Sequence, residues 1–318
     1  MASGEQIKAL LNAYYSNDDS RFKTIALQIA ASEARVGHTK LACEIKSIIE
    51  KSASKNKILK MRNENQLLSY VNQEHRKSEL VVSDEIKIRL DRIILEFRQR
   101  EKLRSYGMKN RSKILAEGAS GTGKTLTASA LATELNLPLY TVQMDKLITK
   151  FMGETSVKLR QIFDTISESR AVFLFDEFDA IGADRTFDNE VGEMRRVLNF
   201  FLQMLENDDS DSIIIAATNN HKMLDQALFR RFDDVLHYGL PDELQIQELF
   251  RIKLGSAYSS KIITEQIRNL AFGLSHAEIT KACEDCIKAM ILEDVSLTQQ
   301  LVKKSIVERR DIYMSKEA

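Results

Sequence analysis

The chain has 318 residues, and its 46 Lys and Arg balance its 46 Asp and Glu, so the formal net charge is zero at pH 7. This balance gives no bulk positive field for nucleic acid, although a local basic groove stays open. No apolar run reaches the roughly 18 residues of a membrane span, and the first residues show no secretory signal pattern. Three cysteines are too few for a disulfide framework. We therefore expect a cytoplasmic protein without a membrane anchor, built from two or three compact units.

The first part of the chain, residues 1–52, is predicted to be a helical domain. Apolar residues recur at helical spacing in 7–14, 22–29 and 41–48. These helices carry no catalytic group, so they are either a packing appendage or a module that docks a client or adaptor. Residues 53–79 follow as a linker, polar and basic up to Asn65 and weakly helical beyond it. Ser83 then provides a cap for a long helix that we expect to extend to Arg104.

A phosphate-binding loop is the most specific feature of the chain. A strand at 113–117 and a helix at 126–135 flank a match to the pattern Gly, four residues, Gly-Lys-Ser/Thr. Glycines let backbone N–H groups surround a polyphosphate, and the helix N-terminus adds a favourable dipole. The expected nucleotide contacts are Gly118, Ala119, Ser120, Gly121, Thr122, Gly123, Lys124, Thr125 and Leu126. Lys124 would reach the β- and γ-phosphates, and Thr125 would offer its hydroxyl to Mg²⁺.

Two carboxylates after a second apolar run indicate hydrolysis of that nucleotide. Residues 171–175 are all apolar and predict a strand buried on both faces, and Asp176-Glu177 follow at its carboxyl end. Ligands of open α/β sheets bind at this end of the strands. We expect Asp176 to hold Mg²⁺, directly or through water, and Glu177 to orient the attacking water.

Further polar residues follow a third apolar strand at 213–217. Asn219 stands where a side chain could hold the lytic water or the γ-phosphate, although Thr-Asn-Asn is also a good turn. Arg230 and Arg231 lie farther on, among apolar neighbours. Adjacent arginines are commonly solvated, but their position beyond the strand favours a functional role. After Pro241 the sequence is helical, and we interpret Cys283 and Cys286 as core residues within a helix rather than a redox or metal pair.

Taken together, these motifs resemble those of AAA-family ATPases over residues 78–316. The resemblance is to the protein-remodelling clade, in particular to compact bacterial members with a helical N-terminal domain. It implies an α/β fold: a three-layer P-loop NTPase core with a five-stranded parallel sheet at 80–241, a helical lid at 242–318 and the N-terminal helical domain. It also implies ATP and Mg²⁺ as cofactors, with Thr125 and Asp176 at the metal.

The resemblance assigns the catalytic roles to Lys124, Glu177, Asn219, Arg230 and Arg231. The arginines match a finger that enters the neighbouring subunit's site, which implies a homo-oligomer, most commonly a hexamer. The two-residue spacer found in many relatives is missing, and of the pair we favour Arg231. Arg195 and Arg196 match arginines near the subunit interface of relatives.

Two more segments resemble motifs of the remodelling clade. Phe151, Met152 and Gly153 match a pore loop that grips a threaded protein, the alternative being that Phe151 is a core residue. Residues 273–279 match a lid motif beside adenine and ribose, so Gly273 and Ala277 join Val82, from the apolar segment 80–82, as expected contacts of the nucleoside. His276 replaces the usual glycine of this motif, and we interpret it as a capping or packing residue.

The predicted function is ATP hydrolysis by a ring that remodels, unfolds or disassembles a protein client. Two alternatives stay open: a nucleic-acid loader or helicase on the same core, and a slow ATP switch that regulates a partner such as a protease. The resemblance adds a separately encoded subtilisin-like protease as a candidate partner. Glu177, Asn219 and the arginine pair argue against a small-molecule kinase because they suit attack by water. Zero net charge argues against nucleic acid as the partner.

Overall fold

The computed structural model describes residues 8–9, 19–35, 38, 40–45, 66–72, 75–148, 152–182, 188–219 and 229–314. The chain divides into two compact units, Met1–Gln66 and Leu67–Ala318. In the first unit, helix α2 (Asp19–Arg35) covers the second predicted helix, and residues 40–45 are also helical. Ala26, Ala30 and Glu33 form the buried side of α2. The first predicted helix lies almost wholly outside the described residues.

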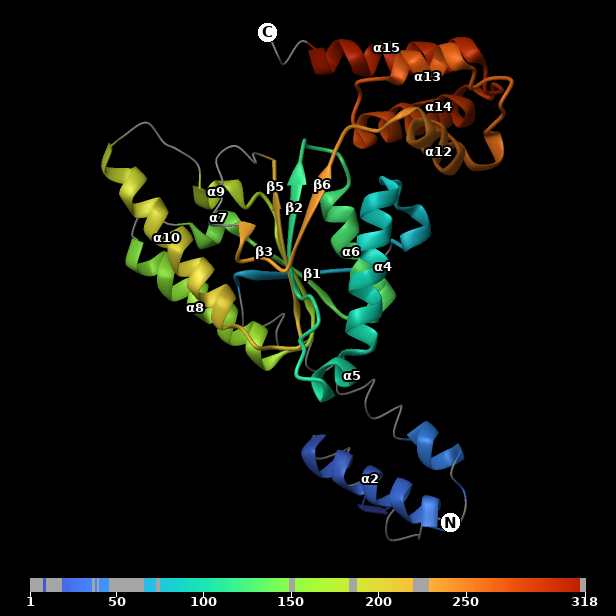
Figure 1. The fold of residues 1–318 in the computed structure, drawn as a ribbon. Coiled ribbons are helices and arrows are strands. Elements are labelled where there is room, and N and C mark those ends of the chain that lie inside the picture. Colours follow the sequence, from blue (N-terminus) through green and yellow to red (C-terminus); the bar gives the residue numbers. More distant parts are fainter. Residues whose placement is uncertain are drawn as a thin grey trace. The chain divides into compact units, whose positions relative to one another are not determined.

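A six-stranded sheet organises the second unit, in the order β1-β3-β4-β5-β2-β6. The strands are β1 (Leu68–Val71), β2 (Lys113–Gly118), β3 (Leu139–Val142), β4 (Val172–Phe175), β5 (Ile213–Thr218) and β6 (Asp234–Tyr238). Strands β2 to β6 run parallel, which confirms the predicted five-stranded parallel sheet. Because their carboxyl ends share one edge, the loops after β2, β4 and β5 meet there (Figure 1).

The sixth strand, β1, corrects the sequence analysis, which expected weak helix after residue 66. Strand β1 pairs antiparallel with β3, from Leu68 opposite Val142 to Val71 opposite Leu139. Tyr70 also packs edge-on against Tyr140, with ring centroids 5.8 Å apart. This pairing supplies hydrogen-bond partners to the backbone of β3, which would otherwise be an open sheet edge. Such a long-range contribution to stability cannot be seen in the local periodicity of the sequence.

Helices cover both faces of the sheet (Figure 1). On one face α4 (Asp84–Arg98) and α6 (Lys124–Leu135) pack on a core of β-branched and leucine side chains. On the other lie α7 (Met144–Leu147), α8 (Met152–Glu168), α9 (Asp179–Gly182) and α10 (Asp188–Asn207). There the rings of Phe163, Phe175, Phe178 and Phe201 contact one another at centroid distances of 4.7–6.2 Å. Between these layers every residue of the central strands β4 and β5 is buried, as the apolar run 171–175 predicted for β4.

Helix α4 begins where predicted and ends earlier than predicted. The Ser83 hydroxyl accepts a hydrogen bond from Ile86 N at 3.4 Å, which caps the first turn. The helix stops at Gln99, and a short helix α5 (Arg100–Ser105) completes the expected length. The 3₁₀ turn η1 (Lys77–Glu79) precedes this region.

The residues after Pro241 form a helical layer with its own core. It comprises α12 (Glu243–Leu254), the 3₁₀ turn η3 (Gly255–Ala257), α13 (Glu265–Ala271), α14 (His276–Glu293) and α15 (Gln299–Met314). Cys283 and Cys286 are buried in this core, as the sequence suggested. Burial raises the pKa of Cys283 to about 12, so its thiol stays protonated and unreactive.

The start of β6 is fixed by a buried carboxylate. Asp234, whose side chain is 5% exposed, lies 2.5 Å from an Nη of Arg89 on α4 and 3.2 Å from an Nη of Arg111. We predict that Asp234→Ala lowers the free energy of unfolding by about 3 kcal/mol, because it leaves two guanidinium groups without their shared partner. Chemical denaturation of the full chain measures this.

Asp209→Ala is the matched control for Asp234→Ala. Asp209 pairs with Lys109 at 2.5 Å, but both side chains are more than 70% exposed. Such a pair contributes less than about 1 kcal/mol. An equal decrease in the free energy of unfolding in the two variants would contradict the structural role of Asp234.

Candidate nucleotide site

The loop between β2 and α6 has a backbone that requires glycine. Gly118, Gly121 and Gly123 have φ angles of +149°, +75° and +104°, which L side chains rarely adopt. A Cβ atom on Gly118 would lie 2.1 Å from the carbonyl oxygen of Tyr238 on β6. Thr122 closes the loop by donating its hydroxyl to the Ala119 carbonyl at 2.8 Å. The loop is therefore a preformed cradle of backbone groups, and Ala119 and Ser120 are its exposed residues.

Lys124, the first residue of α6, joins this loop to the end of β5. Its buried Nζ donates to the carbonyl oxygens of Gly118 and Ala119 and to Asn219 Oδ1, each at 2.8 Å. Burial lowers the pKa of this ammonium, and the nearby carboxylates of Asp176 and Asp179 oppose that shift. The structure thus brings the predicted lysine and Asn219 together.

The two predicted metal-binding residues are also adjacent. Thr125 donates its hydroxyl to Asp176 Oδ2 at 2.7 Å. Among the described residues, no cluster of three or more His, Cys, Asp and Glu could hold a metal ion. The pair fits Mg²⁺, which commonly takes one or two protein oxygens and completes its shell with phosphates and water.

Glu177 adopts an unusual backbone conformation. Its φ is +52°, a left-handed value that costs a non-glycine residue about 1–2 kcal/mol. Glu177 N donates to Asp176 Oδ1 at 3.0 Å, and its carbonyl accepts from Ala180 N at 2.8 Å. Phe178 N in turn donates to the Ala217 carbonyl at 2.8 Å. These bonds hold the turn, which leaves the Glu177 side chain exposed at the edge of the sheet.

Asp179 is a site residue to which the sequence analysis gave no role. Its Oδ1 accepts hydrogen bonds from Thr218 Oγ1 and from Asn219 N, both at 3.2 Å. Asp179 therefore fixes the end of β5 to the turn after β4. The spacing Asp176-x-x-Asp179 was the available signal, because a short helix after the strand turns the second carboxylate toward β5.

The helical layer after Pro241, which we predicted to be the lid and call the lid below, contacts the phosphate-binding loop through the first turn of α14. Ala277 N donates to the Gly121 carbonyl at 2.9 Å, and a Cβ on Gly121 would lie 2.7 Å from Ser275 Oγ. Gly273 has a φ of +90°, which only glycine adopts readily. The structure thus brings Ala277 to the loop, and its predicted contact with the nucleoside stays a prediction. Val82 is 3% exposed and packs in the sheet core, so only its backbone could face a nucleoside.

His276 lies buried beside this contact. It is 9% exposed, and its enclosed ring nitrogens form no hydrogen bond of good geometry with the described residues. Burial lowers the pKa of His276 to about 4, and the Asp242 carboxylate and the Val81 backbone oppose the shift only in part. The ring is therefore neutral at physiological pH. It packs at the start of α14, while Ser275 is the residue that caps the helix by accepting from Glu278 N at 3.3 Å.

The two predicted finger residues are not part of this cluster. Arg230 and Arg231 precede the amino end of β6, whereas the phosphate-binding loop follows the carboxyl end of β2, and the two strands are parallel neighbours. Arg231 forms an ion pair with Glu206 near the end of α10. Arg230 is exposed and has no ion pair with any residue that the structure describes.

Other predicted residues are placed only in part. Phe151 lies outside the described residues, Met152 begins α8, and Gly153 is exposed in its first turn. Arg196 is exposed on α10, and for Arg195 only the helical backbone is described. The roles of these residues stay predictions.

Comparison with known proteins identifies the family. Residues 114–240 match the model of the ATPase family associated with various cellular activities (AAA). An uncharacterized AAA family ATPase of Sinorhizobium fredii is 34% identical over 305 residues, which cover 92% of this chain and 91% of the relative. The chain belongs to the AAA family of ATPases. Membership implies that it binds and hydrolyses ATP.

Other AAA relatives are longer than the matched segment. A putative 26S proteasome regulatory subunit homolog of Methanocaldococcus jannaschii is 36% identical over 183 residues, 56% of this chain and 48% of the relative. Peroxisomal ATPase PEX6 of Saccharomyces cerevisiae is 33% identical over 239 residues, 70% of this chain and 23% of the relative. The chain thus matches about half and a quarter of these two proteins. In the described part of this AAA protein, no helix is long and apolar enough to cross a membrane.

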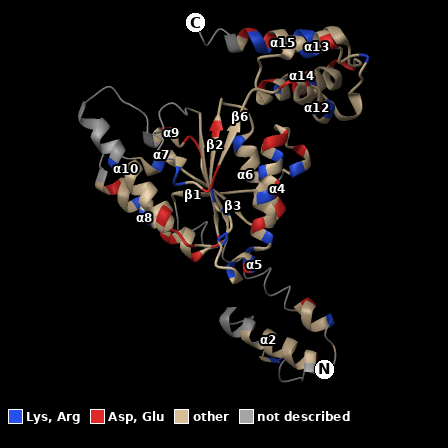
Figure 2. Ribbon diagram, in the orientation of Figure 1, with Lys and Arg blue, Asp and Glu red and all other residues tan. Residues whose placement is uncertain are grey.

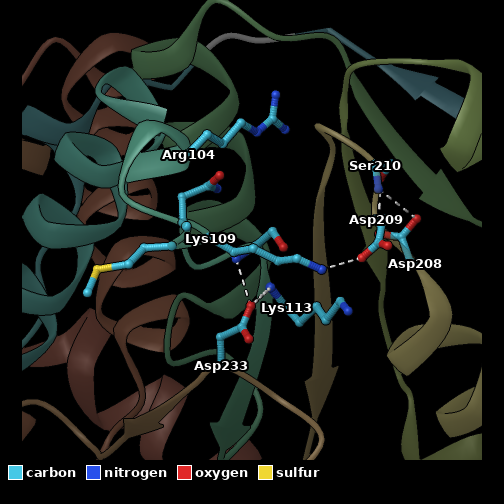
Figure 3. A pocket seen from close by; sticks show the side chains of 11 residues that line it. Arg104, Lys109, Lys113, Asp208, Asp209, Ser210 and Asp233 are labelled. Atoms are coloured by element: carbon cyan, nitrogen blue, oxygen red, sulfur yellow. Dashed lines mark hydrogen bonds and ion pairs between the residues drawn. The ribbon is translucent and has the colours of Figure 1, made fainter. Parts of the chain in front are cut away.

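A hollow of about 350 Å³ lies at the amino ends of the strands of the AAA sheet (Figure 3). Several of its charged side chains have partners. Lys109 pairs with Asp209, and Asp233 accepts from Ser112 N and Lys113 N, each at 2.9 Å. The structure therefore keeps this hollow apart from the nucleotide site, at the other end of the sheet.

The pKa of His276 predicts a pH effect on stability. Because the folded state resists protonation down to about pH 4 and the unfolded histidine titrates near pH 6.5, stability is full above pH 6.5 and falls below it. The loss reaches about 3 kcal/mol near pH 4. We predict that His276→Phe removes this component, so that melting temperatures of variant and wild type diverge increasingly from pH 6.5 to 4. Melting temperatures that fall equally with pH in the two proteins would contradict this role of His276.

Proposed function

We propose that this AAA protein is a Mg²⁺-dependent ATPase that acts as a ring with shared sites and remodels a protein client. One observation carries the shared site: the arginine pair and the phosphate-binding loop lie at opposite ends of parallel neighbouring strands. Arginines in this position cannot reach the γ-phosphate bound to their own loop. A second subunit that presents them to the loop resolves this, and closed rings are the common solution for such head-to-tail contacts.

Within one subunit, each described residue of the site would have a separate role in ATP hydrolysis. Lys124 is held by three oxygens at the position where a β,γ-phosphate would bind, so those oxygens orient its ammonium before the nucleotide arrives. Thr125 and Asp176 would hold Mg²⁺, which neutralises phosphate charge when bound. Glu177 would polarise the attacking water. Asn219, fixed by Asp179, would hold the γ-phosphate or that water from the other side.

The ion pair of Arg231 bears on which arginine enters the neighbouring site. The sequence favoured Arg231, but Glu206 of the same chain engages its guanidinium. Arg230 has no ion pair with the described residues, so it would not have to break one in order to enter the neighbouring site. We therefore propose Arg230 as the principal finger and Arg231 as a residue that positions the segment.

Remodelling of a protein is the function that the relatives' names and the charge distribution favour. One relative is named a proteasome regulatory subunit homolog and another a peroxisomal ATPase. Acidic and basic residues are interspersed along α4 and along the helices α12–α15 rather than separated by sign (Figure 2). We propose that Phe151, Met152 and Gly153 contact the client in the pore. The N-terminal unit would select the client or its adaptor.

The shared site is tested by the ATPase rate per subunit as a function of protein concentration. We expect this rate to rise with concentration in the wild type, since each site needs a neighbour. Arg230→Ala should lower the plateau by about 10³-fold or more, the range typical of arginine fingers. Arg231→Ala should lower it less.

Arg251→Ala is the matched control for these two variants. Arg251 is an exposed lid arginine paired with Glu248 at 2.5 Å, three residues away on the same helix. Its loss should leave the rate within twofold. A rate per subunit that is independent of concentration and of both arginines would overturn the shared site.

Threading is tested by stimulation of the ATPase with an unfolded protein such as casein. Phe151→Ala should keep the unstimulated ATPase rate, and its stimulation by casein should be at least tenfold weaker than in the wild type. The reason is that an aromatic ring makes apolar contacts with client side chains of any sequence. Phe151→Tyr should retain the stimulation. Stimulation by single-stranded DNA that vanishes with salt would instead support the nucleic-acid alternative.

A further inference from the structure

Tyr238, the last residue of β6, touches the phosphate-binding loop at its start. It lies opposite Gly118 in the parallel pairing of β2 with β6. The two residues are so close that a Cβ on Gly118 would also lie 2.8 Å from the Cβ of Tyr238. The ring of Tyr238 is buried in the core that α4 and α6 cover. Tyr238 is therefore fixed against the first glycine of the loop, with its side chain on the same side of the sheet as α6.

The hydroxyl of Tyr238 connects to the other end of the loop through Thr127 on α6. It donates to Thr127 Oγ1 at 2.7 Å, and Thr127 Oγ1 donates to the Gly123 carbonyl at 3.0 Å. Burial raises the pKa of Tyr238 above its ordinary value, so its hydroxyl keeps its hydrogen and remains a donor. A hydroxyl has one hydrogen, and because the Thr127 oxygen accepts from Tyr238, that hydrogen is directed to Gly123. A threonine in a helix has two accessible rotamers, and this contact selects the one that bonds the carbonyl four residues back.

The Gly123 carbonyl sets the direction of the next backbone N–H. It accepts from Thr127 N at 2.9 Å as well as from the Thr127 hydroxyl, so two hydrogen bonds hold it toward the body of α6. The described residues contain no cis peptide bond, and in a planar trans peptide the carbonyl and the N–H point in opposite directions. The Lys124 N–H therefore points out of the first turn of α6, where a helix N-terminus binds phosphate.

We propose that Tyr238 is a positioning residue of the nucleotide site, which acts through Thr127 to hold the Gly123–Lys124 peptide with its N–H toward the phosphates. This inference rests on the proposed ATP site and adds to it a residue that does not itself touch the nucleotide. Neither Tyr238 nor Thr127 belongs to the loop motif, and their contact joins residues 111 positions apart in the sequence.

The orientation of the peptide can be measured directly. Gly123-Lys124 is the only Gly-Lys pair in the chain, so ¹³C in the carbonyl of glycine and ¹⁵N in lysine isolate this one peptide in a nuclear magnetic resonance spectrum. In Tyr238→Phe, we expect the ¹³C signal of Gly123 to move in the direction of a weaker hydrogen bond before any nucleotide is added. In the wild type, inorganic tripolyphosphate should shift the ¹⁵N signal of Lys124.

Binding and turnover of Tyr238→Phe should separate. We expect the dissociation constants of ATP and of tripolyphosphate both to rise about three- to tenfold, the scale of one hydrogen bond. The KM for ATP should rise with them while kcat stays within about twofold, because a backbone N–H binds the phosphate alike in the ground state and in the transition state. A loss of kcat at unchanged KM would contradict this role.

Variants of Thr127 test whether Tyr238 acts through it. Thr127→Val keeps the shape and removes both side-chain hydrogen bonds, so adding Tyr238→Phe to it should weaken binding no further. Thr127→Ser keeps the hydroxyl and should bind ATP within about twofold of the wild type. Additive effects of Thr127→Val and Tyr238→Phe would overturn the connection. If Tyr238→Phe does not fold, the difference between Thr127→Ser and Thr127→Val in the Gly123 signal and in ATP affinity decides.

Tyr140→Phe is the matched control, since it removes the hydroxyl of another buried tyrosine of the sheet, one that forms no hydrogen bond with the described residues. It should leave the Gly123 signal and both dissociation constants unchanged. An unchanged Gly123 signal or unchanged affinities in Tyr238→Phe would overturn the positioning role. Failure of the wild type to bind both ATP and tripolyphosphate would instead refute the proposed nucleotide site, whereas the Gly123 signal without ligand would still show whether Tyr238 holds the peptide.

Discussion

The backbone at the phosphate-binding loop passes so close to its neighbours that side chains do not fit there. Gly118 faces the carbonyl of Tyr238 on β6, and Gly121 faces Ser275 and Ala277 of the lid. The first contact sets the loop against the sheet, and the second sets the lid against the loop. With the loop fixed in this way, Lys124 lies within hydrogen-bond distance of Asn219. The relative position of sheet, loop and lid thus depends on the absence of two Cβ atoms.

A second connection between the lid and the sheet runs through the segment 80–82. The lid core takes Val81 from this segment, and the flanking Leu80 and Val82 belong to the sheet core. A shift of this segment therefore moves apolar side chains in both cores at once. Close-packed interiors do not deform continuously, so such a shift favours discrete arrangements.

Sequence predicted best what local chemistry determines. The glycines, Lys124 and the carboxylates after β4 stand in motifs whose spacing fixes their geometry, and the structure brings them together. Strand β1 was missed because its stability comes from pairing with β3, seventy residues away. The role of Asp179 and the isolation of His276 were missed for a related reason. Both depend on which atoms lie next to each other in the folded chain, and this cannot be predicted from periodicity in the sequence.

For Arg230 and Arg231, the sequence motif and the topology of the sheet give different kinds of information. Their proposed role came from the sequence, whereas the argument for a second subunit comes from strand direction. Because β2 and β6 are parallel, the segment before β6 and the loop after β2 are forced to opposite edges of one sheet. No side-chain rearrangement within a subunit removes this separation, since a strand of five residues is longer than an arginine side chain. The parallel sheet that concentrates Lys124, Asp176 and Asn219 at one edge therefore also keeps Arg230 and Arg231 away from that edge. The proposed shared site, built from two copies of the fold, is the arrangement that brings the arginines to the loop.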